Sequence, residues 1–342
     1  MIPAPQTAST QVEQLTGKKP RRITILDTAV CVRVKFGRIG TSRKVKKTSS
    51  ITQEIDQETG ETHEVEKKVF TVDAEEKLIR VSKKLLDSPE MDALNQLDSE
   101  IRKYIRSRVL ESGIDDGLYW ISLKKEVIDE FETQMKAYFT RIVELVNNLA
   151  EAYEGIVQTD QERLRGAFDP EDYLTPAEVK DKFRMTWQYI TFTTPRSLEA
   201  VSEELYRKAQ EDLNITIQLA QDAVQLALRT EMAELVDWAI DRLSPGENGK
   251  RKILRSKTKT GEEIGLIKRL HEFFGTFSGR NITNDYELQN LVSKAEAIMT
   301  GVDVDALKKS DSLRDSVMQS FAELKSELEP LIVEAPNRDI DV

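Results

Sequence analysis

Cysteine and histidine are almost absent from this sequence. The 342 residues include one cysteine, Cys31, and two histidines, His63 and His271. A single cysteine excludes an intramolecular disulfide framework and is typical of a reducing cytoplasm. Because zinc centres are built mainly from cysteine and histidine, the composition almost excludes one. We interpret His63 as an exposed residue of a polar turn and His271 as a residue of a helix surface.

Long apolar runs and glycine-rich motifs are missing as well. No run approaches the roughly 18 apolar residues needed to span a membrane, and the first residues lack the apolar core of a signal peptide. The sequence contains no phosphate-binding loop, no G-x-G-x-x-G and no G-x-S-x-G motif. We therefore expect a cytoplasmic protein that makes no membrane contact and binds no cofactor.

Two acidic clusters could still hold a magnesium ion. Asp169, Glu171 and Asp172 form one cluster, and Asp303 and Asp305 form the other. A magnesium site needs carboxylates together with a substrate phosphate, and nearness in sequence supports it only weakly. We interpret both clusters as helix caps and solvated turns, and predict no enzyme and no metal. A metal-dependent enzyme would require Asp169 and Asp172 to converge with acidic residues from elsewhere.

Charge is distributed unevenly along the chain. The whole sequence has 50 Lys and Arg against 60 Asp and Glu, a net charge of −10. The first fifty residues hold eleven basic side chains against Glu13 and Asp27, a net of +9, so the remainder carries −19. This asymmetry indicates two different surfaces, of which one could meet a polyanion.

The segment Val32–Lys47 has seven positive side chains and no negative one. Apolar and other side chains alternate from Val30 to Phe36, the period of a half-buried strand, with Phe36 on the apolar face. Our first interpretation is a hairpin in a small antiparallel sheet, with a basic face that is solvated or that meets the acidic remainder of another subunit. The alternative is a nucleic-acid-binding surface in which seven side chains neutralise phosphates: Arg33, Lys35, Arg38, Arg43, Lys44, Lys46 and Lys47.

Two long amphipathic stretches dominate the middle of the chain. Apolar residues recur every three or four positions over 123–164 and again over 198–243, which predicts two helices, each about 60–70 Å long. Two helices of matched length, joined by an insertion, most simply form an antiparallel coiled-coil hairpin. The predicted fold class is therefore mainly α. We expect an elongated helical bundle built on this hairpin, with a small antiparallel β-element from the N-terminal segment and one inserted strand.

The insertion at 166–197 has signals of its own. Thr175 and Glu178 have the spacing of a capping box that opens a short helix. Alternation over 183–193 then predicts a strand, and because a single strand is not stable we expect it to pair with the N-terminal sheet. Four aromatic side chains are core residues or, alternatively, anchors of a protein interface: Tyr173, Trp187, Tyr189 and Phe192.

Capping signals mark the remaining helices. Ser88 followed by Pro89 predicts a helix that runs to about residue 111. Asn284 is the predicted cap of a C-terminal helix, and Asp303 and Ser310 are the predicted caps of two more short helices. These signals divide the chain into a flexible tail at 1–22, a small basic β-element at 23–75, a helical segment at 76–112, the long hairpin at 113–245 with its inserted tip at 166–197, a C-terminal helical region at 246–332 and a polar tail at 333–342.

Four stretches follow one another in an order that resembles a known family. They are "LLDSPEMDALNQLDSEIRKYIRSRVL", "GLYWISLKKEVIDEFETQM", "FDPEDYLTPAEVKDKFRMTWQYI" and "GKRKILRSKTKTGEEIGLIKRLHEFFGTFSGRNITNDYELQNLV". Over about 30–332 the chain resembles a family of uncharacterised, mostly helical bacterial and phage proteins. Genes of that family often sit beside MoxR-type AAA+ ATPases and von Willebrand factor A-domain proteins. By analogy alone, the resemblance implies an adaptor or substrate of such an ATPase, and it supplies no catalytic residues.

The function predicted from the sequence is non-enzymatic. We expect a scaffold or adaptor that assembles with itself or with a complex containing an AAA+ ATPase. An amphipathic helix with an apolar face wider than one partner can cover favours such assembly. The alternative is nucleic-acid binding by the basic N-terminal strands, with an affinity that would fall steeply as salt rises.

Overall fold

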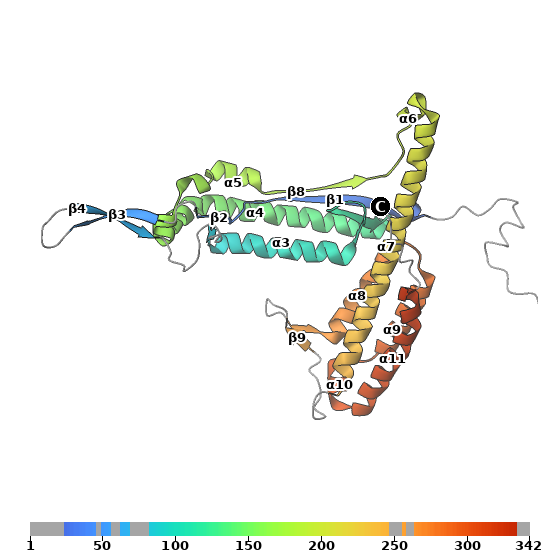
Figure 1. The fold of residues 1–342 in the computed structure, drawn as a ribbon. Coiled ribbons are helices and arrows are strands. Elements are labelled where there is room, and N and C mark those ends of the chain that lie inside the picture. The colour runs from blue at the N-terminus through green and yellow to red at the C-terminus, as the bar shows by residue number, and fades with distance from the viewer. Residues whose placement is uncertain are drawn as a thin grey trace, which may run out of the picture. The chain divides into compact units, whose positions relative to one another are not determined.

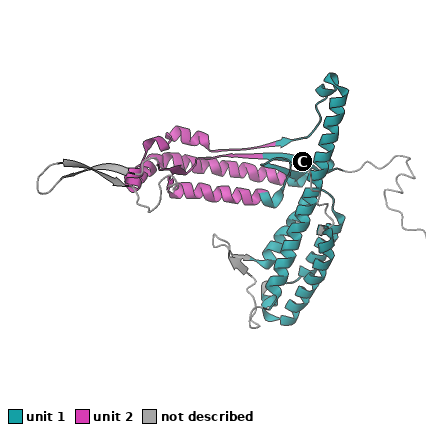
Figure 2. Ribbon diagram, in the orientation of Figure 1, with its two compact units in different colours: residues 1–33, 106–128, 189–342 teal, residues 34–105, 129–188 magenta. Residues whose placement is uncertain are grey.

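The structure, a computed structural model, describes residues 24–45, 49–55, 62–68, 82–245, 255–257 and 263–333. Most of them are helical, and the strands include a small antiparallel sheet, as predicted (Figure 1). They divide into two compact units (Figure 2). Unit 1 takes its residues from 1–33, 106–128 and 189–342, and unit 2 from 34–105 and 129–188. No described helix is long and apolar enough to cross a membrane.

The largest described sheet has the strand order β6-β7-β1-β8. Its strands are β6 (Leu110–Glu111), β7 (Leu118–Ser122), β1 (Ala29–Gly37) and β8 (Arg184–Ile190). β1 and β7 are antiparallel, with Ala29 opposite Ser122 and Arg33 opposite Leu118. β8 is the other neighbour of β1, which confirms that the inserted strand pairs with the N-terminal sheet.

The segment Val32–Lys47 does not form one hairpin, contrary to the sequence prediction. β2 (Ser42–Lys44) pairs with β5 (Ser82–Lys84), whereas β1 lies between β7 and β8. The neighbours of β1 in its sheet are strands from later in the chain, and β2 is not among them. Cys31 and Val32 are both fully buried, so β1 also begins covered on both faces. Two further antiparallel ribbons are β3 (Ser49–Ile55) with β4 (Thr62–Lys68), and β9 (Arg255–Lys257) with β10 (Glu263–Gly265).

Unit 2 contains most of α3 (Pro89–Arg108) and α4 (Lys125–Leu164), together with α5 (Pro176–Lys182). The Met91 amide donates to Ser88 Oγ over 3.3 Å, so the predicted cap of α3 is confirmed, although the helix ends before residue 111. The capping box of α5 is also confirmed by reciprocal bonds between Thr175 and Glu178. The core of this unit includes Leu85, Leu86, Met91, Leu94, Leu149, Tyr153 and Val179.

Unit 1 contains the helices of the C-terminal half. They are α6 (Ser197–Val201), α7 (Glu203–Leu243), α8 (Leu266–Arg280), α9 (Tyr286–Met299), α10 (Val304–Lys309) and α11 (Asp311–Val333), preceded by the single turn α2 (Ile25–Thr28). Their shared core includes Trp120, Leu228, Leu270, Leu288 and Phe321. Asp303 and Ser310 accept bonds from the helix amides that follow them, as predicted, but α11 has 23 residues and is not the short helix that was predicted.

The predicted hairpin of two long helices is not confirmed. Both helices are present, as α4 and α7, but α4 belongs to unit 2 after its first turn and α7 belongs to unit 1. Each buries its apolar stripe in the core of its own unit. The second helix also starts later than predicted, because Ser202 leaves the helical conformation and its side chain accepts a bond from the Leu205 amide.

The N-terminal cap of α9 lies one residue later than predicted. Asp285, and not Asn284, accepts a bond from the Leu288 amide, over 3.0 Å. Asn284 instead has a φ of 54°, in the left-handed region that asparagine tolerates better than most residues. The spacing to Glu287 therefore indicated the right turn of the helix and the wrong capping residue.

Candidate protein interaction surface

Helix α7 is held in unit 1 by the part of its length that follows residue 216. Its buried side chains begin at Ile217 and continue through Ala220, Val224, Leu228, Met232 and Leu235 at steps of three or four residues. Each large apolar side chain that is fully buried contributes about 1.5–3 kcal/mol. None of residues 203–216 is buried, and Leu213 is partly buried and packs against the core of the unit. This first part of α7 therefore buries little apolar surface in that core.

Local interactions explain why residues 203–216 are nevertheless helical. Ser202 caps the first turn, where Glu203 and Glu204 complement the positive end of the helix dipole. Arg207 and Lys208 follow these two glutamates at a spacing of four residues, the order that best supports a helix. The sequence thus specifies a helix here without specifying what covers it.

A second stripe of side chains lies on the uncovered part of α7. Leu205, Lys208, Asp212, Ile215 and Leu219 follow one another at steps of 3, 4, 3 and 4, the spacing of a coiled-coil seam. We call these five residues the α7 seam. At about 100° per residue, the seam is centred well over a quarter turn away from the stripe that includes Ile217 and Val224.

The apolar members of the α7 seam are exposed. The exposed fraction is 52% for Leu205, 59% for Ile215 and 40% for Leu219. Val201, at the end of α6, is 78% exposed. Single exposed apolar residues are ordinary, but four within nineteen positions across the end of α6 and the first part of α7 mark a surface that a partner can cover.

A buried polar network further along the chain fixes α7 to its neighbours. Arg229 donates through Nε to Asp285 Oδ2 over 2.7 Å, through Nη1 to the Leu331 carbonyl and through Nη2 to Glu287. Gln225 donates to the same Asp285 oxygen over 3.1 Å. Burial raises the pKa of Asp285, but these hydrogen bonds outweigh burial and leave the pKa below its ordinary value. One side chain of α7 is thereby tied to both α9 and α11.

The described residues of the predicted nucleic-acid surface are divided between the two units. Arg33 belongs to unit 1 and donates to Asp115 over 2.9 Å. In unit 2, Arg38 and Arg102 both donate to Asp98 Oδ2. The Arg102 guanidinium lies 4.8 Å from the centre of the Phe36 ring, so that ring is covered by protein.

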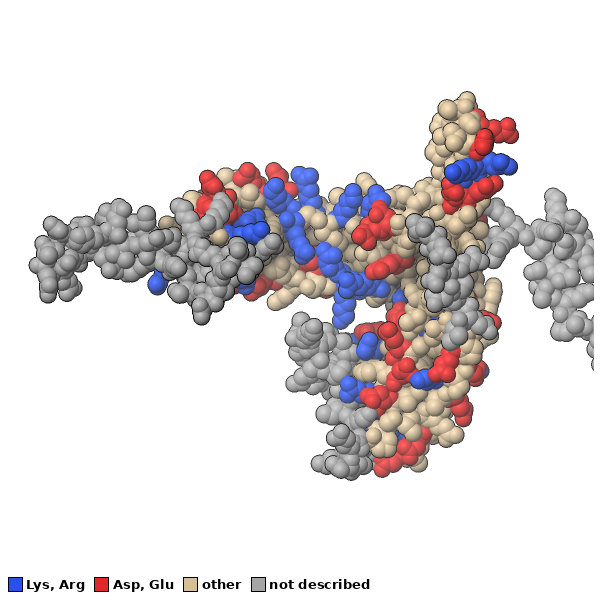
Figure 3. Space-filling model, in the orientation of Figure 1, with Lys and Arg blue, Asp and Glu red and all other residues tan. Residues whose placement is uncertain are grey.

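The other predicted basic residues vary in their surroundings. Arg43 donates to the carbonyl groups of Gly40 and Ser42, while Lys35 and Lys44 are exposed. Lys46 and Lys47 lie outside the residues that the structure describes. Figure 3 nevertheless shows Lys and Arg side chains gathered on one face of unit 2, over α3 and α4.

The four aromatic interface candidates are also divided between the two units. Tyr173 packs in unit 2, where its ring stacks on Phe168 at 5.3 Å and its hydroxyl donates to Asp160. Trp187 is half-buried and donates to Glu132 over 2.8 Å. In unit 1, Phe192 packs against Trp120 at 6.1 Å, and Tyr189 is 41% exposed. Tyr173 and Phe192 thus pack against other aromatic side chains, and the interface role of the four residues stays a prediction.

Acidic side chains of the insertion have structural partners. Asp169 accepts a bond from the Glu171 amide, and Asp172 forms a buried ion pair with Lys83 at 2.7 Å. The fully buried Asp160 accepts bonds from the Leu86 amide and from Tyr173. Among the described residues, no group of three or more His, Cys, Asp or Glu is placed to hold a metal ion. His271 is exposed on α8, as predicted.

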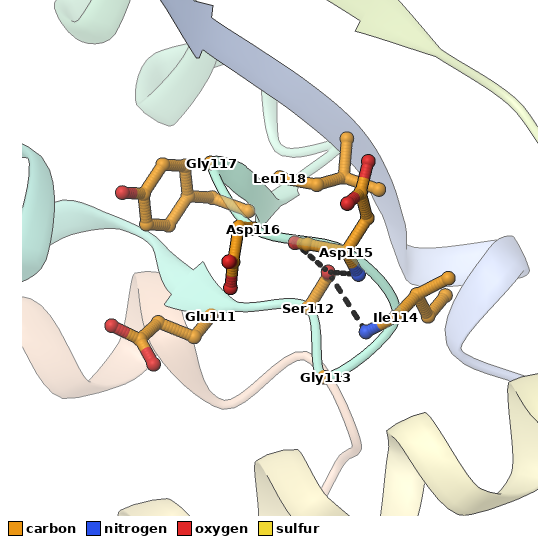
Figure 4. Close-up of a pocket in the computed structure, with 9 residues that line it drawn as sticks. Glu111, Ser112, Gly113, Ile114, Asp115, Asp116, Gly117 and Leu118 are labelled. Carbon is orange, nitrogen blue, oxygen red and sulfur yellow. Dashed lines mark hydrogen bonds between the residues drawn. The ribbon is translucent and has the colours of Figure 1, made fainter.

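A cavity of about 410 Å³ lies in unit 1 at the loop between β6 and β7 (Figure 4). Ser112 shapes the loop: its Oγ accepts bonds from the Ile114 and Asp115 amides. Gly113 and Gly117 have φ values of 68° and 71°, which glycine alone adopts at no steric cost. The lining is acidic, with Glu111, Asp115 and Asp116, and Asp115 is already paired with Arg33. We therefore interpret the cavity as a consequence of the tight loop geometry, and not as a set of side chains arranged around a ligand.

The sequence reasoning did not identify the α7 seam. The five positions have regular seam spacing, but Lys208 and Asp212 interrupt the apolar pattern. The stronger stripe that continues from Leu213 through Ile217 masked the weaker one on the same helix. Only the exposed fractions show that the second stripe is uncovered.

Comparisons of the chain with protein-family models, with curated proteins and with solved structures find no match. The family resemblance noted in the sequence motifs therefore stays a prediction.

Proposed function

We propose that the chain is a non-enzymatic scaffold or adaptor that acts in the cytoplasm through protein–protein assembly. The observation that carries this proposal is the uncovered first part of α7, with exposed Leu205, Ile215 and Leu219 on a helix whose other end is firmly buried. A rigid helix that presents apolar side chains is a common form of docking surface. The proposal includes the antiparallel hairpin of two long helices that the sequence predicts, which would extend this docking surface along a long helical element.

Assembly is tested by sedimentation velocity of the full chain at roughly 1–200 µM, because self-association depends on concentration. The chain is examined alone and with equimolar MoxR-type AAA+ ATPase and its von Willebrand factor A-domain companion, which the family resemblance suggests as partners. We expect a species larger than one copy in at least one mixture. A chain that remains a 39.0 kDa monomer in every mixture contradicts the proposal.

Nucleic-acid binding is the second candidate function. The face of unit 2 that gathers Lys and Arg side chains supports it (Figure 3). It ranks lower because Arg38 and Arg102 share Asp98, and Arg141 forms a two-bond pair with Glu100. Those pairs lower the positive potential that a phosphate backbone would meet.

A further inference from the structure

We propose that the α7 seam pairs with the α7 seam of a second copy of this chain, antiparallel and about a two-fold axis. This inference rests on the proposed function, because it names the partner of the same surface. It is carried by a symmetry in the seam itself. Four of the five positions are arranged so that a reversed copy of the helix matches apolar residues with apolar residues and opposite charges with each other.

The matching can be followed position by position about Gln210. Leu205 and Ile215 lie five residues before and after it, so each faces the other on the reversed copy. Lys208 and Asp212 lie two residues before and after it, so the two copies form two Lys208–Asp212 pairs. Such pairing of the two seam positions is the rule in antiparallel coiled coils, in which side chains of one helix pack between those of the other.

The ends of the seam extend the same pattern. Leu219 lies nine residues after Gln210 and Val201 lies nine residues before it, and both are exposed. Leu219 of one copy would therefore meet the corner between α6 and α7 of the other. A C2 interface must be self-complementary in this way, whereas a surface for a different protein has no need of it.

Charge makes the antiparallel arrangement specific. In a parallel pair in register, Lys208 would face Lys208 and Asp212 would face Asp212, which is repulsive. Glu211 flanks the seam near the axis, where Lys208 of the other copy also lies within reach. The seam spans only about 20 Å, so we expect a weak dimer with a Kd in the micromolar range.

The test is a charge exchange in the full chain, followed by sedimentation velocity. Lys208→Glu alone and Asp212→Lys alone each place like charges opposite one another, and each should raise the dimer Kd at least about tenfold. The double variant should restore the wild-type Kd. An equimolar mixture of the two single variants should form a mixed dimer.

The mixture is the decisive arm of the test. Lys208 and Asp212 are also four residues apart on one helix, and a pair within one chain could explain rescue by the double variant. A pair within a chain cannot explain rescue between two different variants. Far-UV circular dichroism confirms that each variant is folded, which is expected because both side chains are exposed.

Cross-linking tests the register independently. Leu205→Cys mixed with Ile215→Cys should give a disulfide-linked dimer under mild oxidation, whereas Leu205→Cys mixed with Leu219→Cys should not. Cys31 is fully buried and does not compete. A cross-linked product in the first mixture and none in the second supports a two-fold axis at Gln210. Any other result contradicts that axis.

The outcomes separate this inference from the proposed function. Self-association that is unchanged by the charge variants overturns the α7 seam and leaves the scaffold proposal standing. A chain that is monomeric alone but binds the ATPase complex also overturns the pairing of two α7 seams. It leaves the scaffold proposal standing, with a different protein as the partner. A chain that is monomeric in every mixture overturns both.

Discussion

Arg229 of α7 donates through Nε to Asp285 Oδ2 of α9 over 2.7 Å, and the Asp285 side chain is only 2% exposed. The same guanidinium reaches the Leu331 carbonyl of α11 over 2.7 Å. Three helices of unit 1 thus meet at one arginine, next to a carboxylate that has almost no contact with water. A charge in such a place is stabilised only as long as its partners remain.

Removal of Arg229 should therefore destabilise the chain strongly. Arg229→Met leaves the Asp285 carboxylate buried without its cation, which costs about 3–5 kcal/mol. Urea denaturation measures this loss in the free energy of unfolding. Glu327→Gln, which breaks an exposed pair with Lys294, is the matched control and should cost less than about 1 kcal/mol. A similar loss in both variants would contradict the assigned role of Arg229.

Stability should fall at acid pH in a way that depends on Asp285. Burial opposes ionisation of Asp285, but hydrogen bonds from Arg229, the Leu288 amide and Gln225 leave its pKa below the ordinary 3.8. The folded state then binds fewer protons than the unfolded state near pH 3–4, so this contribution is present above about pH 4 and lost as pH falls through the folded pKa.

Comparison with Asp285→Asn isolates that contribution. The difference in unfolding free energy between wild type and variant, measured in urea from neutral pH down to the acid limit of folding, should shrink as pH falls. If burial dominated instead, the folded pKa would be raised and the difference would grow with falling pH.

Cys31 should be unreactive in the folded chain. The side chain is fully buried, and burial raises the pKa of the thiol from 9.0 to about 12. Because the thiolate is the reactive form, Ellman's reagent at pH 8 should modify wild type far more slowly than it modifies the unfolded chain in guanidinium chloride. Equal rates in the two states would show that β1 is not covered on both faces as described.

Gly37 should not tolerate a side chain. A Cβ at this position would lie 2.6 Å from the Lys182 carbonyl oxygen, which belongs to backbone that cannot turn aside as a side chain would. We expect Gly37→Ala to destabilise by about 1–3 kcal/mol, as measured by urea denaturation. Gly155→Ala is the control: apart from neighbouring residues and the nearby backbone of α4 itself, no atom lies within 4 Å of its Cβ position, and alanine should stabilise the helix by about 0.5–1 kcal/mol. Equal effects of the two changes would argue against the close approach at Gly37.

Binding to nucleic acid should be weak if the scaffold proposal is right. Fluorescence anisotropy of labelled single- and double-stranded oligonucleotides at about 50 and about 200 mM salt measures it, because phosphate contacts weaken steeply with salt. The comparison variant changes the exposed Lys35 and Lys44 to glutamate. Tight binding at low salt that disappears in this variant would place the nucleic-acid function first.

The sequence by itself determined the local structure. Interactions within a few residues explain the capping box of Thr175 and Glu178, the cap at Ser88 and the spans of the two long helices. The hydrogen bonds and the side-chain spacing of these features involve only residues that are close together in the sequence. The cap of α9 shows the limit of such signals, since Asn284 and Asp285 are adjacent and equally suited.

The tertiary structure alone decided how these elements are covered. β1 takes its neighbours from β7 and β8, and Arg229 finds Asp285 across 56 positions of sequence. Such partners are selected by burial of the whole core, which no local pattern contains. The α7 seam shows the same limit, because its spacing is visible in the sequence but its exposure depends on which face of α7 the core of unit 1 covers.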